Sequence, residues 1–66
     1  MVNIDDYPQL KMIAWNRPGL RTIAEPDALA LYERNWRQVE EKAMDKPERD
    51  LLGRLVNEYG HGILNV

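Results

Sequence analysis

The sequence predicts an all-α protein with three helices, at residues 6–16, 26–43 and 46–59. Three observations support this fold class. Apolar residues follow a helical spacing through the middle of the chain, a proline lies near the start of each expected helix, and glycines follow the first and third. The 66 residues are enough for one small domain, residues 1–66, close to the lower size limit for independent folding.

The central helix has the clearest pattern, over Pro26–Ala43. Its apolar residues alternate in steps of three and four, which places them on one stripe: Leu29, Tyr32, Trp36, Val39 and Ala43. Pro26 suits a first helical position, because its missing N–H would have no partner there. Glu25 and Asp27 place negative charge at the positive end of the helix dipole. We therefore expect a continuous helix that packs along this stripe.

The first predicted helix, 6–16, is apolar on two sides. One side carries Leu10, Ile13 and Ala14, and the other carries Met12 and Trp15. Such a helix either lies between other elements or keeps one face for a partner. The Arg-Pro-Gly sequence at 17–19 ends it, and we expect an extended connector over 19–24 with no pairing partner that the sequence identifies.

The third predicted helix starts with the spacing of a capping box, in which Asp45 is three residues before Glu48. Its apolar stripe consists of Leu51, Leu52, Leu55, Val56 and Tyr59. The short connection before it predicts that the second and third helices are antiparallel or steeply crossed. We expect Gly60 to be a left-handed C-cap. The apolar C-terminal tail, 63–66, is expected to dock, either over the helices or paired with residues 2–4.

Composition argues against several classes of site. The chain has no cysteine and only one histidine, His61, which argues against disulfides and against a zinc site, so we expect no metal and no cofactor. Nine basic and eleven acidic residues are mixed along the chain, as on an ordinary solvated surface. No apolar run reaches the roughly 18 residues of a membrane span, and the N-terminus does not resemble a secretory signal. We expect a cytoplasmic protein.

The sequence offers no constellation of catalytic residues. There is no serine or cysteine, and Thr22 is the single threonine, so triad chemistry lacks its usual nucleophiles. His61 lies between two glycines, where a helix terminus is a simpler interpretation than an acid or base. No phosphate-binding or calcium-binding loop is present. We therefore expect that the protein is not an enzyme.

The leading functional hypothesis is a small protein–protein interaction or accessory module. It would bury an apolar patch on the first two helices, composed of Met12, Trp15 and Leu31 and bordered by Lys11 and Arg34. The partner would be another protein or a second copy of the chain. The opposing interpretation is that these apolar side chains are buried, because a chain of this size needs every large apolar residue for its own core. For Leu31, contact with the first helix and exposure are equally compatible with the pattern.

The alternative hypothesis is a nucleic-acid-associated regulator built on a helix-turn-helix-like pair. Phosphate contacts would come from Arg17, Arg21, Arg34 and Arg37, if folding gathers them. Two observations oppose it. The third helix begins with acidic residues where a recognition helix offers basic or amide side chains, and the characteristic turn glycine is missing. Nucleic acid is therefore the less favoured partner.

Overall fold

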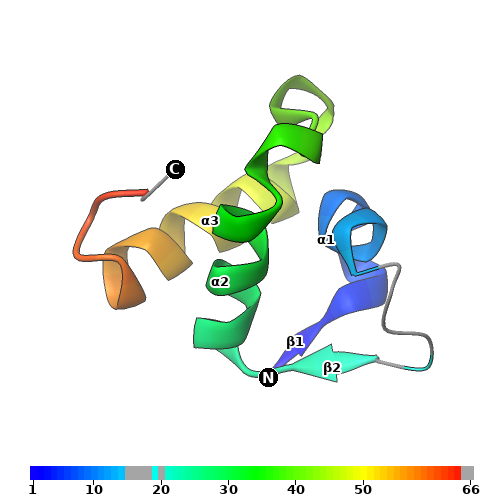
Figure 1. Ribbon diagram of the computed structural model, residues 1–66, viewed down its shortest axis with the longest axis horizontal. Coiled ribbons are helices and arrows are strands. Elements are labelled where there is room, and N and C mark those ends of the chain that lie inside the picture. Colours follow the sequence, from blue (N-terminus) through cyan, green and yellow to red (C-terminus); the bar gives the residue numbers. More distant parts are fainter. Residues whose placement is uncertain (15–18, 20, 65–66) are drawn as a thin grey trace.

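The computed structural model describes residues 1–14, 19 and 21–64. Its α-helices are α1 (Pro8–Ile13), α2 (Glu25–Arg34) and α3 (Lys46–Tyr59). Two short strands, β1 (Val2–Asn3) and β2 (Thr22–Ile23), and three 3₁₀ turns, η1 (Ile4–Asp6), η2 (Trp36–Gln38) and η3 (Glu41–Ala43), complete the described part. In Figure 1, α3 passes behind α2, α1 lies to one side, and the small sheet lies at the N-terminal end of α2. A mostly helical fold with three α-helices is thus confirmed.

The first helix is shorter than predicted at its start. Residues 4–6 form the η1 turn, and Tyr7 is extended, with φ −129° and ψ 102°. The physical reason is Pro8, whose ring disfavours a helical conformation in the residue before it. Asp6 therefore lies in η1, and α1 begins at Pro8. The helix also ends earlier than predicted, at Ile13 with Ala14 as its C-cap, and residue 16 itself lies outside the described residues.

The connector finds its pairing partner at the N-terminus. Val2 pairs with Ile23 and Asn3 with Thr22 in an antiparallel ladder. The Ile4 amide extends this pairing by donating to the Arg21 carbonyl at 2.9 Å. Val2 and Ile23 are buried while Asn3 and Thr22 are exposed, which is the alternation expected of a sheet with one covered face. Residues 2–4, which the sequence offered as one possible pairing partner for the C-terminal tail, thus pair with the connector instead.

The prediction that the central helix continues to residue 43 is wrong. Helix α2 ends at Arg34, and residues 35–45 contain η2 and η3. At the end of α2, Asn35 donates both its backbone N–H and its side-chain amide to the Leu31 carbonyl, at 3.1 and 3.0 Å. Trp36 and Val39 still contact the core, because a 3₁₀ turn also brings residues three apart to the same side. Ala43, by contrast, is exposed.

The third helix has the predicted bounds, and Asp45 caps it by accepting a hydrogen bond from the Glu48 amide at 3.1 Å. The left-handed residues after it are His61 (φ 56°) and Gly62 (φ 81°), so the prediction for Gly60, whose φ is −107°, is wrong. Gly60 is constrained differently. A Cβ there would lie 2.9 Å from the Ile63 carbonyl oxygen and 3.0 Å from that of Val56.

The tail after this turn is only partly described. Ile63 is 70% exposed, whereas Leu64 is half-buried and packs against the core. A docked tail over its whole length stays a prediction, because residues 65–66 lie outside the described part.

One hydrophobic core lies where the three helices and the sheet meet. It includes Leu10, Ile13, Leu29, Tyr32 and Leu55, each no more than 4% exposed. Within the described residues, no helix is long and apolar enough to cross a membrane. The same residues contain no group of three or more histidine, cysteine, aspartate or glutamate side chains that could hold a metal ion.

Candidate functional site

Glu48 is a fully buried acidic residue, with 0% of its surface exposed. Its Oε1 accepts from the Gln9 amide at 3.0 Å, and its Oε2 accepts from the Leu10 amide at 2.9 Å and from the Tyr32 hydroxyl at 2.6 Å. Glu48 lies in the first turn of α3, and its carboxylate caps the first turn of α1. We call this arrangement the Glu48 junction. The positive ends of two helices therefore share one carboxylate.

The Glu48 junction is closed. Burial raises the pKa of Tyr32, and its hydrogen bond to the Glu48 carboxylate raises it further, so the hydroxyl stays protonated and acts as a donor. Among the described residues, no buried side-chain nitrogen or oxygen lacks a hydrogen-bond partner. The junction therefore leaves no polar atom free to bind a substrate, and its role is to join α1, α2 and α3.

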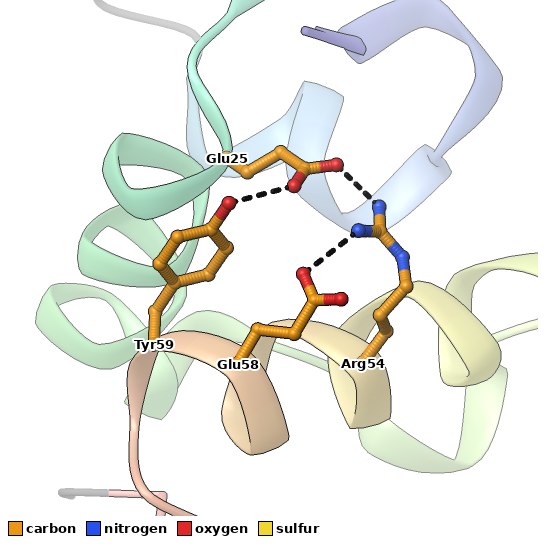
Figure 2. Close-up of polar contacts among 4 residues, drawn as sticks. All are labelled: Glu25, Arg54, Glu58 and Tyr59. Carbon is orange, nitrogen blue, oxygen red and sulfur yellow. Dashed lines mark hydrogen bonds and ion pairs between the residues drawn. The ribbon is translucent and has the colours of Figure 1, made fainter.

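A second polar cluster connects the start of α2 to the end of α3 on the surface (Figure 2). The Arg54 guanidinium donates to Glu25 at 2.5 Å and to Glu58 at 3.1 Å, and the Tyr59 hydroxyl donates to Glu25 at 2.8 Å. We call these four residues the Glu25 cluster. It connects residues about thirty positions apart, Glu25 with Arg54 and Tyr59.

The hydrogen bonds of the Glu25 cluster shift its pKa values. The hydrogen bond from Arg54 contributes most, and that from Tyr59 next, to lowering the pKa of Glu25 to about 2. The hydrogen bond between Tyr59 and Glu25 also raises the pKa of Tyr59. Glu25 is therefore ionised at neutral pH and has both carboxylate oxygens engaged. The cluster is better suited to linking α2 and α3 at the surface than to acid–base catalysis. A general acid or base needs a pKa near the working pH, and the pKa of Glu25 is far below neutrality.

The remaining candidate is an open groove of about 750 Å³ on the outer side of α3. We call its lining residues on α3 the base, and those on η2, on η3 with the following Met44, and at Leu64 the walls. The apolar side chains that line it are Trp36, Met44, Leu52, Val56 and Leu64. Met44 is buried, and the other four are half-buried. The end of α2 at Arg34 creates this site, because a continuous helix to residue 43 would not provide these two short turns as a wall.

Charged and polar side chains line the groove beside its apolar base: Glu41, Lys42, Arg49 and Asn57. All four are exposed. Lys42 and Arg49 form no ion pair with any described residue, whereas Arg54 on the same helix has two acidic partners. The groove therefore offers two cations that the fold leaves available, against one acid.

Gly53 lies in the middle of α3 and lines the groove. A Cβ at this position would have no atom within 4 Å, so no steric contact within the described chain requires a glycine. Glycine inside a helix costs about 1 kcal/mol relative to alanine. The fold thus has a residue of low helix propensity at a position that lines the groove.

The structure removes one residue, Leu31, from the patch predicted on the first two helices. Leu31 is 6% exposed, so it belongs to the core and cannot contribute to an exposed patch. Met12 is 39% exposed, and Lys11 and Arg34 are exposed. Trp15 lies outside the described residues. The described part of the patch is thus one methionine with two cations, and the half-buried apolar side chains that line the groove form a separate apolar surface.

The arginines of the alternative hypothesis are also separated where they are described. Arg21 adjoins β2, near the N-terminal end of α2, whereas Arg34 and Arg37 lie at and beyond its C-terminal end. Ten helical residues, roughly 15 Å of helix, stand between these ends. Arg17 lies outside the described residues. Residues 35–45 also separate α2 from α3, so the expected short turn of a helix-turn-helix is absent from this described segment.

Sequence reasoning missed the groove because Leu52 and Val56 fit a single core stripe with Leu51 and Leu55. The structure divides this stripe: Leu51 and Leu55 are buried, and Leu52 and Val56 are half-buried on the groove side. The signal that could have indicated the groove is Gly53, a glycine in the interior of a strong helical pattern and away from either helix cap.

The comparisons with known proteins identify no relative: no protein-family model, no curated protein and no solved structure matches the chain.

Proposed function

We propose that this chain is a cytoplasmic protein–protein interaction module whose groove binds an apolar, acidic segment of a partner protein. The observation that carries the proposal is the groove itself, where five apolar side chains lie beside two cations that form no ion pair with any described residue. Concave apolar sites with a few convergent polar groups are the usual form of binding sites. This keeps the class of function that the sequence favoured and moves the surface to α3.

Charge complementarity selects the chemistry of the partner. Lys42 and Arg49 would face acidic side chains, while the apolar base would take leucine-like or aromatic anchors. Glu41 is the only acidic side chain among the described residues that line the groove, so the lining charge favours an anion. A partner segment with both apolar and acidic residues satisfies both parts of the surface.

The experiment is selection of random peptides displayed on phage, using the wild-type protein as the target. We expect enriched peptides that combine apolar and acidic residues and that shift the amide signals of Trp36, Leu52 and Val56 in ¹H–¹⁵N NMR spectra. Arg49→Glu should weaken binding about fivefold at low salt, with a smaller effect at high salt.

Arg34→Glu is the matched control, because Arg34 is also exposed but does not line the groove. It should leave peptide affinity unchanged. Failure to enrich any peptide, or signal shifts confined to the Met12 side, would overturn the proposal. So would self-association that shifts the groove signals, measured by light scattering and NMR, because a second copy of the chain would then be the occupant.

A further inference from the structure

We infer that the segment bound in the groove is an amphipathic α-helix that crosses α3 at Gly53. This inference rests on the proposed function and specifies the conformation of the partner segment.

The first argument is the pattern of lining positions along α3. They are Arg49, Leu52, Gly53, Val56 and Asn57, which follow the spacing i, i+3, i+4, i+7 and i+8 and form one stripe of the helix. A stripe of this kind is the surface that one helix offers to another. The inner stripe of α3, which includes Leu51 and Leu55, is already buried in the core, so the outer stripe is a second packing face.

The second argument is the position of Gly53 within this stripe. Leu52 and Val56 adjoin it in the groove, and nothing in the described chain lies within 4 Å of where its Cβ would be. Two helices approach each other most closely where a small residue lies at the crossing point. A glycine that the fold does not need sterically is explained by the close approach of the occupant's backbone.

The third argument concerns the backbone of the occupant. A segment buried on apolar side chains must pair its own N–H and C=O groups. The α3 backbone is engaged in its own helix, and the described strands, β1 and β2, do not line the groove. An extended peptide would therefore find no strand edge to pair with, whereas a helix satisfies its backbone internally.

The inference is tested with the peptides selected above. We expect their apolar residues to recur at helical spacing, and their circular dichroism to show increased helix content on binding to the protein. Gly53→Gln should weaken binding about tenfold or more, because the added side chain stands at the crossing point. Ala30→Gln is the matched control, since Ala30 is an exposed position of α2 outside the groove, and it should leave affinity unchanged.

Circular dichroism of the two variants without peptide establishes that both keep the fold. Peptides with apolar residues at alternate positions, or equal affinity for Gly53→Gln and the wild type, would overturn the helical occupant while the proposed function stood. Failure to select any peptide would instead overturn the proposed function, so the two failures are distinguishable.

Discussion

Two regions of helix α3 differ in how far their side chains are used by the fold. At its first turn, the buried Glu48 carboxylate is fully engaged by three donors from α1 and α2. Along its outer stripe, apolar side chains are half-buried beside Arg49 and Lys42 of η3, which form no ion pair with a described residue, and no described atom lies within 4 Å of a Cβ built at Gly53. The first region contributes to folding, whereas the second is better explained by an external partner. A binding function is therefore better placed at the groove, whose side chains the fold uses less, than at the Glu48 junction.

The sharpest test compares two adjacent residues, Glu48 and Arg49. Glu48→Ala should lower the free energy of unfolding by about 4 kcal/mol, because the buried amides of Gln9 and Leu10 and the Tyr32 hydroxyl lose their acceptor. Arg49→Ala should change it by less than about 0.5 kcal/mol, since its side chain is exposed and forms no ion pair with a described residue. Urea unfolding followed by circular dichroism measures both. Equal effects of the two substitutions would contradict the contrast between the regions.

Tyr32→Phe removes one donor from the Glu48 junction and keeps the ring in the core. We expect a loss of about 2 kcal/mol, because the hydrogen bond is made to a charged acceptor in a buried site. Thermal unfolding of the variant and the wild type gives the value.

The same tyrosine predicts alkaline behaviour. Its pKa is raised in the folded state, so its contribution to stability is complete below the ordinary tyrosine value of 10.0 and decreases as pH rises above it. Absorbance at the phenolate band should therefore show one tyrosine that ionises only as the fold opens. Ionisation of all three tyrosines without unfolding would contradict this expectation.

Gly53→Ala tests the groove region through stability alone. The position is helical and open, so alanine should stabilise the fold by about 1 kcal/mol, which for a domain of this size raises the midpoint of thermal unfolding by about 4–8 °C. Differential scanning calorimetry provides the measurement. A lower midpoint would mean that the glycine has a structural role after all.

The smallest effect is expected from the exposed Glu25 cluster. The pKa of Glu25 is lowered from 4.5 to about 2, so its stabilising contribution is present above pH 4.5 and is lost as pH falls toward 2. The difference in stability between the wild type and Glu25→Gln should therefore be largest near neutral pH and disappear in this acidic window. Urea unfolding at several pH values between neutral and 2 measures it, and a difference that stays constant would contradict the assignment.

The sequence predicted the local features of this fold and missed those that depend on distant contacts. The bounds of α3 and its Asp45 cap followed from spacing and capping chemistry, because both involve neighbouring residues. The end of α2 could not be predicted in this way, because the segment after it depends on distant contacts. The Glu40 amide, for example, donates to the Gln9 side chain, 31 positions away, and not to a helical carbonyl. The pairing of β1 with β2 was missed for the same reason.

The site was less predictable than the fold. Leu31 could have been buried or exposed according to its position on a helix, and only its packing shows that it is buried. The groove depends on two 3₁₀ turns that replace a predicted helix, so no pattern in the sequence could assemble it. Gly53 was visible, but a single glycine does not reveal which neighbours surround it.

The Glu48 junction also orders events during synthesis. Helix α1 has six residues, too few to be stable in isolation, and its first amides depend on a carboxylate about 38 residues further along the chain. On the ribosome, where the N-terminus emerges first, residues 8–13 leave the exit tunnel before the carboxylate that accepts from their amides. The first helix in the sequence therefore completes its hydrogen bonding only after the start of the last helix has been translated.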